Sequence, residues 1–246
     1  MARAVLTRDP VDAEPYAVAL RALGVEVVAM PVTRTAAAAD PDALGRAIAT
    51  GPFAATIVAS PRAAAELARA VANVDASVLG EVWAVGPATQ RALAIAKLAA
   101  HHPEGVRDVE QLATQIASTL TAGMRVLVPR AEDGRTEGIA ILRTAGAHVV
   151  DVIAYRTVPI AADDPAVEHG ARVLRAGDAQ VCCVFAPSQA VALAALVGPL
   201  AKLATRFCAI GETTAATLRD AGITEVTIAA TPTPDGIAAA VRTLLS

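Results

Sequence analysis

Apolar residues in this chain gather into short runs, and amphipathic stretches separate those runs. The runs are apolar along their whole length, which is typical of strands covered on both faces. Strands are predicted over 3–7, 25–30, 56–60, 82–86, 125–129, 148–158, 180–186, 206–211 and 225–230. Helices are predicted over 12–23, 40–50, 62–72, 88–99, 108–121, 135–145, 165–176, 188–197, 213–221 and 235–245. Short strands separated by helices predict parallel sheets with crossover helices, an α/β fold.

The chain also repeats itself. Residues 20–35 align with 142–157 at seven of sixteen positions, and 58–71 align with 184–197. The stretch 82–93, "VWAVGPATQRAL", aligns in the same way with 207–218, "FCAIGETTAATL". Two homologous halves, about 1–122 and 123–246, are therefore expected. Two such units facing one another form a cleft, and ligands of open α/β sheets bind beyond the carboxyl ends of the strands.

Small hydroxyl residues follow the glycines of the aligned turns at 86–89 and 211–214. Thr89 belongs to the first turn, and Gly211, Thr213 and Thr214 belong to the second. A helix N-terminus carries orphan N–H groups and a partial positive charge, so it can hold a carboxylate or a phosphate. The alternative is an ordinary helix cap, since Thr and Ser cap helices well. Ser60 and Ser188 belong to the related turns "SPRA" and "APSQ", whose prolines suit a first helical turn.

Three arginines are expected at the same rims. Arg8 and Arg130 each follow a predicted strand, and Arg62 stands beside Ser60. The forked guanidinium suits a substrate with several carboxylates. The alternative is a solvated surface arginine.

Tyr155 is one of two tyrosines, and the aligned position in the first half is Thr33 in "VTRT". A phenol can donate a proton or a hydrogen bond to a leaving hydroxyl. The alternative is a tyrosine that only fills the core.

Composition excludes several classes of protein. The chain is 54% hydrophobic and carries 21 basic and 24 acidic residues, interspersed, so a general nucleic-acid binder is not expected. The sequence contains no dinucleotide-binding, Walker or G-x-S-x-G motif and no spacing typical of a metal site. Its three cysteines lie in apolar runs, and no long apolar segment or leader is apparent, which favours reduced cysteines in a cytoplasmic protein.

Several blocks together resemble the uroporphyrinogen-III synthase family. They are "YRTV", "FAPS", "AIGETTAATLRDAG" and "TPTPDGIAAAV", with "SPRAA", "AVGPAT" and "VPRAEDGRTEG" in the first and middle thirds. The resemblance implies two doubly wound, parallel-sheet α/β domains joined by a two-stranded β ladder, with a cleft between them. One domain would combine 1–33 with 160–246 and the other would span 38–153, with 27–37 and 149–159 as the connecting strands.

The resemblance also implies an activity and a set of site residues. The family converts hydroxymethylbilane to uroporphyrinogen III, with loss of water and inversion of ring D, mainly by positioning the substrate. Tyr155 matches the tyrosine that assists departure of the hydroxyl. The expected substrate contacts are Arg8, Ser60, Arg62, Thr89, Arg130, Ser188, Arg206, Gly211, Thr213, Thr214 and Thr233. The family often has Ser or Thr where this chain has Ala186, so one donor is missing.

The resemblance implies no cofactor and no metal. The expected partner is the small-molecule substrate, without nucleic acid or membrane, and the expected state is a monomer in transient contact with the preceding enzyme of the pathway. Two alternatives stay open. A two-domain tetrapyrrole or polyanion sensor with weak or no catalysis is favoured by Ala186, and a binder of an unrelated small anion rests on fold analogy alone.

Overall fold

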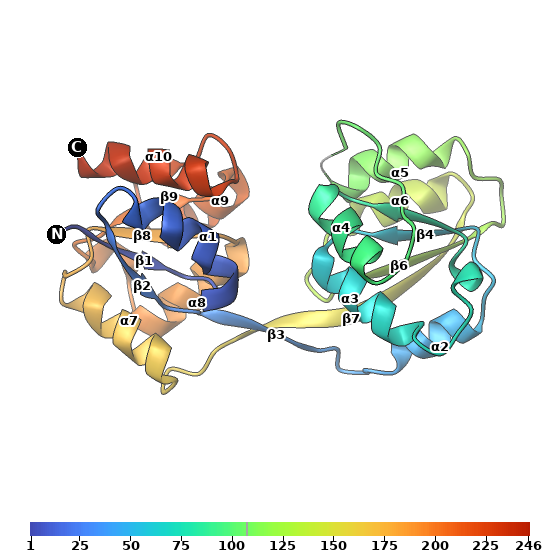
Figure 1. Ribbon diagram of the computed structural model, residues 1–246, viewed down its shortest axis with the longest axis horizontal. Coiled ribbons are helices and arrows are strands. Elements are labelled where there is room, and N and C mark those ends of the chain that lie inside the picture. Colours follow the sequence, from blue (N-terminus) through green and yellow to red (C-terminus); the bar gives the residue numbers. More distant parts are fainter. Residues whose placement is uncertain (107) are drawn as a thin grey trace. The chain divides into compact units, whose positions relative to one another are not determined.

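The computed structural model describes residues 1–106 and 108–246, and its chain divides into two compact units (Figure 1). The first unit comprises Met1–Arg34 and Val158–Ser246, and the second unit comprises Thr35–Thr157. The chain passes between the units twice, near β3 (Thr33–Ala37) and near the end of β7 (His148–Pro159).

Five strands form the sheet of the first unit, in the order β10-β9-β8-β1-β2, and all their pairings are parallel. They are β1 (Arg3–Leu6), β2 (Glu26–Ala29), β8 (Val181–Val184), β9 (Arg206–Ala209) and β10 (Val226–Ile228). The helices are α1 (Pro10–Arg21), α7 (Pro165–Arg175), α8 (Pro187–Val197), α9 (Glu212–Asp220) and α10 (Pro234–Leu245), with a 3₁₀ turn at Leu200–Lys202.

The core of the first unit has two layers, one on each face of the sheet. Helices α7, α8 and α9 pack on the face that carries Cys182 and Val184, while α1 and α10 pack on the face that carries Val181 and Cys183. Because both faces are covered, β8 is buried at every position. The first unit is therefore doubly wound.

The second unit repeats this architecture, with the strand order β3-β7-β6-β4-β5 and parallel pairings among β4 to β7. Its further strands are β4 (Ala55–Val58), β5 (Glu81–Ala84) and β6 (Arg125–Ala131). Its helices are α2 (Ala43–Ala49), α3 (Pro61–Ala70), α4 (Pro87–Ile95), α5 (Val109–Ala117) and α6 (Glu137–Thr144), with a 3₁₀ turn at Ala76–Leu79. Helices α2, α3 and α4 cover one face, and α5 and α6 cover the other.

Each predicted helix and strand has a counterpart in the structure, but the helices predicted over 88–99 and 108–121 end at Ile95 and Ala117. The chain also differs from the prediction around Pro31. A single strand was expected over 27–37, but the structure has β2 in one sheet and β3 in the other. Met30 and Val32 still donate their N–H groups to Leu6 and Thr7 of the first unit. Pro31 has no N–H to donate, so the strand is interrupted there before the chain joins the second sheet.

All three cysteines are free thiols and fully buried in the first unit. Cys183 lies opposite Cys208 on the neighbouring strand, while Cys182 faces the other layer. Burial raises the pKa of the Cys182 thiol well above its usual range, and the contact with Cys208 together with burial raises that of Cys183.

Because all three thiols are fully buried, we expect Ellman's reagent to leave them unmodified in the native protein for as long as the first unit stays folded. All three should react at once in denaturant. The measurement is the absorbance of the coloured thiolate that the reagent releases when a protein thiol reacts with it. Rapid reaction of the native protein would show that β8 and β9 open locally.

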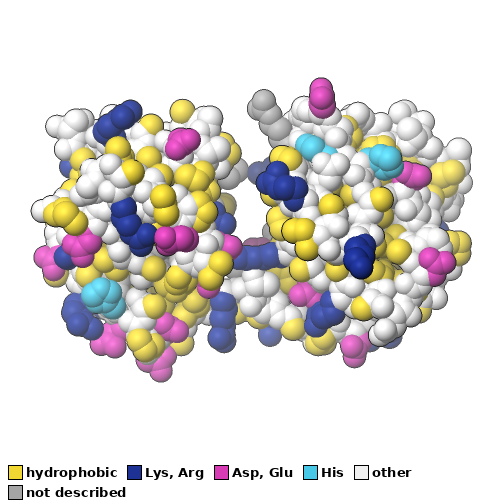
Figure 2. Space-filling model, viewed as in Figure 1, with side chains coloured by type: hydrophobic (Ala, Val, Ile, Leu, Met, Phe, Trp, Pro, Cys, Tyr) yellow, Lys and Arg dark blue, Asp and Glu magenta, His cyan; other side chains and the backbone are white. Residues whose placement is uncertain are grey.

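None of the helices in residues 1–106 and 108–246 combines the length and the apolar character that a membrane span requires. Figure 2 shows that the visible face of each unit carries basic and acidic side chains, scattered among apolar and neutral ones.

Candidate functional site

Tyr155 and Ser60 meet at the carboxyl edge of the second sheet. The Tyr155 hydroxyl lies 3.0 Å from the Ser60 Oγ, and either oxygen can be the donor. Ser60 is also the N-cap of α3, where its Oγ accepts a hydrogen bond of 3.1 Å from the Ala63 N–H. The Tyr155 side chain is 8% exposed and packs in the α2–α4 layer of the core. A phenol is thus held at one end by packing and at the other by a single hydroxyl.

An irregularity in the sheet determines where Tyr155 points. Arg130 pairs with Ile153, but the next residue, Ala131, pairs with Tyr155, so Ala154 is an extra residue in β7. As a result, Ala154 and Tyr155 are both buried in the same core layer, although neighbouring strand residues ordinarily face opposite ways. Such bulges redirect side chains and are frequent beside active sites.

A pocket of about 490 Å³ opens at this edge. Ser60, Arg130 and Tyr155 line it, and so do Arg135 and Glu137 near the start of α6. Arg135 is exposed and was not predicted as a site residue. The same pocket holds acidic side chains at Asp108 and Glu110, so its wall carries both charges.

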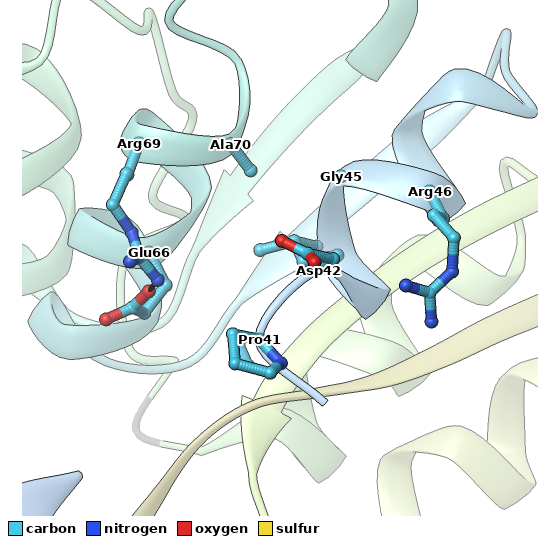
Figure 3. A pocket seen from close by; sticks show the side chains of 9 residues that line it. Pro41, Asp42, Gly45, Arg46, Glu66, Arg69 and Ala70 are labelled. Carbon is cyan, nitrogen blue, oxygen red and sulfur yellow. Dashed lines mark hydrogen bonds and ion pairs between the residues drawn. The ribbon is translucent and has the colours of Figure 1, made fainter. Parts of the chain in front are cut away.

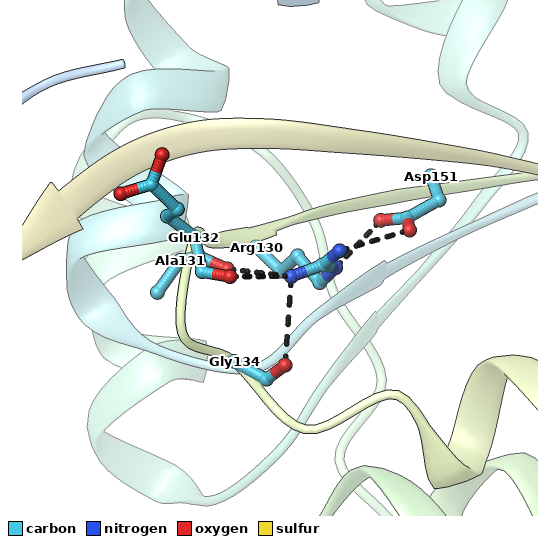
Figure 4. Close-up of polar contacts among 5 residues, drawn as sticks. All are labelled: Arg130, Ala131, Glu132, Gly134 and Asp151. Carbon is cyan, nitrogen blue, oxygen red and sulfur yellow. Dashed lines mark hydrogen bonds and ion pairs between the residues drawn. The ribbon is translucent and has the colours of Figure 1, made fainter. Parts of the chain in front are cut away.

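Arg130 lies in this pocket wall, but its guanidinium is already engaged (Figure 4). Two of its N–H groups bind the Asp151 carboxylate at 2.7 and 3.1 Å. Its Nη1 donates to the backbone oxygens of Ala131, Glu132 and Gly134 at 2.9, 3.1 and 3.5 Å. The structure therefore uses Arg130 to join the end of β6 to the turn that follows. Asp151 was not predicted, although a single carboxylate within the apolar run 148–155 was the available signal.

Thr89 and Arg62 complete the predicted set in the second unit. Arg62 is exposed in the first turn of α3, beyond the end of β4. Thr89 is the third residue of α4, beyond the end of β5, and only 2% of its side chain is exposed. The structure thus brings Ser60, Arg130 and Tyr155 into one pocket and places Thr89 in the neighbouring helix.

In the first unit, most of the predicted residues lie along four neighbouring strand ends. They are Arg8 after β1, Ser188 after β8, Gly211, Thr213 and Thr214 after β9, and Thr233 after β10. Because the strands are parallel, all of these ends share one edge of the sheet.

The helices that begin at this edge are capped differently. Thr233 caps α10 by accepting from the Gly236 N–H at 3.2 Å, whereas Gly211 and Ala186 offer no side chain to cap α9 and α8. Thr213 is exposed, and Thr214 is 1% exposed at the same helical position as Thr89. The N-termini of α8 and α9 therefore present backbone N–H groups without a capping hydroxyl.

Arg8 is held over aromatic rings. Its guanidinium carbon lies 5.4 Å from the Tyr16 ring centre and 5.3 Å from that of Phe185, and Asp12 lies 3.9 Å away. About 29% of the side chain stays exposed. Stacking leaves the edge of a guanidinium open to an anion.

Arg206 differs from the other predicted residues because it is the first residue of β9. The start of a parallel strand lies at the amino edge of the sheet, opposite the ends that carry Ser188 and Gly211. The structure does not bring Arg206 together with them.

A second pocket of the second unit lies between α2 and α3, about 360 Å³ in volume (Figure 3). None of the predicted residues lines it. Its two arginines are paired within the unit, Arg46 with Asp40 and Arg69 with Glu66. Throughout residues 1–106 and 108–246, no group of three His, Cys, Asp or Glu side chains has the arrangement of a metal site.

Comparison with solved structures shows the same fold elsewhere. Uroporphyrinogen-III synthetase from Helicobacter pylori matches with a TM-score of 0.68 at 18% identity, over 99% of this chain and 100% of that chain. A mutant uroporphyrinogen III synthase from Thermus thermophilus matches with a TM-score of 0.63 at 19% identity, over 100% of this chain and 99% of that chain. At this identity the likeness concerns the fold. No curated protein sequence gives a significant match.

A family model describes the sequence itself. The model of uroporphyrinogen-III synthase HemD matches residues 14–239, which include the second sheet, every strand of the first sheet except β1, and all of the pocket around Tyr155. The order of the sequence blocks, the doubly wound architecture and this match agree, and the chain belongs to the uroporphyrinogen-III synthase family.

Proposed function

We propose that this protein is an active uroporphyrinogen-III synthase, a lyase that closes hydroxymethylbilane to uroporphyrinogen III with loss of water and inversion of ring D. The observation that supports this proposal most is the Tyr155–Ser60 hydroxyl pair in a pocket at the carboxyl edge of its sheet. Tyr155 is the residue that the family resemblance assigns to the departing hydroxyl.

The hydrogen bonds around Ser60 suit that role. Ser60 Oγ accepts from the Ala63 N–H, so its own proton can go to the Tyr155 oxygen. The phenol proton is then directed to the leaving hydroxyl, which departs as water and leaves an azafulvenium cation. The phenolate is stabilised by Ser60, and it recovers a proton when the closed ring loses one from carbon. Tyr155 thus acts as a general acid and ends the cycle in its starting form.

Ring inversion requires that the chain be held bent while the substituted carbon of ring D attacks. Left alone, this cation closes without inversion, so the protein must act by positioning. The N-termini of α8 and α9, the exposed Thr213 and the stacked Arg8 can bind the acetate and propionate groups. In the second unit, Arg135 takes the carboxylate-binding role that had been expected of Arg130. The proposed substrate contacts also include Thr89, Arg62, Ser188 and Thr233. Arg206 lies at the opposite, amino edge of the first sheet, so it contacts the substrate only if the substrate reaches that edge.

The proposed enzyme is a monomer, needs no cofactor and works in the cytoplasm. Reduced thiols, such as the three buried ones, are stable in that compartment.

One observation favours a second function. Ala186 stands at the N-cap of α8, where Ser60 stands at the related N-cap of α3, so one hydroxyl is missing from the first unit. A protein that binds the tetrapyrrole without converting it would need fewer such groups.

The test gives freshly generated hydroxymethylbilane to the purified protein and follows both consumption and binding. A synthase consumes the substrate faster than the spontaneous closure does. Tight binding that slows closure would assign the protein to the sensor function instead. A rate equal to that of buffer, with no binding, would contradict both.

A further inference from the structure

Arg130 and Asp151 form an ion pair that is largely withdrawn from solvent. Their side chains are 16% and 22% exposed, and the carboxylate meets the guanidinium through both of its oxygens. Charge-assisted pairs of this forked kind are both strong and geometrically specific. The pair joins β6 to β7, since Arg130 is the sixth residue of β6 and Asp151 the fourth of β7.

The guanidinium also fixes the turn that follows β6. Its Nη1 is the common donor to three backbone oxygens in 131–134, and Figure 4 shows these bonds on the side of the guanidinium away from Asp151. Because these three hydrogen bonds hold the turn, the turn shifts when the guanidinium moves. The position of the turn therefore depends on Asp151, which holds the other side of the guanidinium.

The same turn also contacts the backbone of Tyr155. The Glu132 N–H donates a hydrogen bond of 2.9 Å to the Tyr155 carbonyl oxygen, and Ala131 is the strand partner of Tyr155 across the bulge. Contacts therefore run without a break from Asp151 through Arg130 and the turn to the backbone of Tyr155. Among the residues that the structure describes, packing in the core and the bond to Ser60 hold its ring beyond that point.

Few donors of Arg130 are left for a ligand. A guanidinium has five N–H groups, and the contacts with Asp151 and the three carbonyls occupy four of them. A substrate carboxylate could reach one N–H at most, which rules out the forked contact for which arginine is suited.

We propose that Arg130 and Asp151 are positioning residues, which set the bulge of β7 and thereby aim the Tyr155 phenol at the substrate. The effect on turnover rests on the proposed function, whereas the effect on Tyr155 itself does not.

The first experiment observes Tyr155 directly. The chain has two tyrosines, so 3-fluorotyrosine labelling gives two ¹⁹F signals, and the variant Tyr16→Phe identifies them. We expect Asp151→Asn and Arg130→Lys to shift or broaden the Tyr155 signal and to leave the Tyr16 signal unchanged. Asp133→Asn is the matched control, since it removes the same charge from an exposed position in the same turn. Fluorescence of Trp83, the single tryptophan, reports whether the second unit remains folded.

The second experiment measures kinetics on the same variants. We expect each to lower kcat roughly tenfold with KM nearly unchanged, because misplacing a catalytic group slows the chemical step more than binding. The double variant should be no slower than the slower single variant, since both break one set of contacts. A carboxylate-binding Arg130 would instead raise KM in Arg130→Lys only.

The outcomes are separable. If wild-type protein has no turnover, the proposed function fails, and the ¹⁹F signals still decide the positioning role. If Asp151→Asn does not fold, Arg130→Lys carries the same test. A Tyr155 signal identical to wild type in the folded variants would overturn the proposal.

Discussion

Replacing Tyr155 with phenylalanine is expected to reduce kcat roughly a hundredfold while the protein stays folded, which is the usual scale for loss of a general acid. The phenyl ring keeps the packing of a side chain that is 8% exposed, so only the hydroxyl and its 3.0 Å contact with Ser60 are lost. The measurement is kcat and KM on hydroxymethylbilane, corrected for spontaneous closure, with thermal unfolding measured in parallel.

Thr205→Val is the matched control for this substitution. It also removes a buried hydroxyl, which donates to the Ala179 oxygen at 2.9 Å, but Thr205 precedes β9 at the amino edge of the other sheet. It should lower the free energy of unfolding by about 1 kcal/mol and leave kcat unchanged. If Tyr155→Phe turned over as fast as wild type, the phenol would have no part in the mechanism.

The second large effect concerns stability. Gly138→Ala should lower the free energy of unfolding of the second unit by about 1–3 kcal/mol, the usual range for overpacking. A Cβ on Gly138 would lie 2.6 Å from Val109 Cγ1 and 2.8 Å from the Val109 carbonyl oxygen, so α5 and α6 would have to separate. Denaturant unfolding followed by the fluorescence of Trp83 measures this.

Gly45→Ala gives the opposite expectation in the same unit. Gly45 lies in α2, and a Cβ there meets nothing within 4 Å. Alanine should therefore raise the free energy of unfolding by about 0.5–1 kcal/mol, because it favours helix and restricts the unfolded chain. Equal effects of the two substitutions would show that helix propensity, rather than the contact with Val109, determines the cost at Gly138.

Much of the fold was predictable because each strand is a short apolar run and each helix begins with a recognisable signal. Ser60 and Thr233 cap α3 and α10, and proline opens several helices at the first turn. The doubly wound sheets follow from strands such as β8, which is apolar throughout and buried throughout.

The sequence could not show which hydrogen bonds each polar side chain makes. The extra residue at Ala154 has no sequence signal, yet it turns Tyr155 toward Ser60. The Nη1 hydrogens of Arg130 bind backbone carbonyl oxygens, and because any residue provides such an oxygen, no residue type in the sequence indicates these bonds. The position of Arg206 was accessible in principle, because the first residue of a parallel strand lies away from the edge where ligands bind.

The most direct test of the account is the identity of the product formed from hydroxymethylbilane at increasing concentrations of wild-type protein. If the protein folds the chain for attack by the substituted carbon of ring D, the fraction of the type III isomer rises with protein concentration until it exceeds that of type I. Product that stays type I at every concentration, as in buffer alone, would contradict the account.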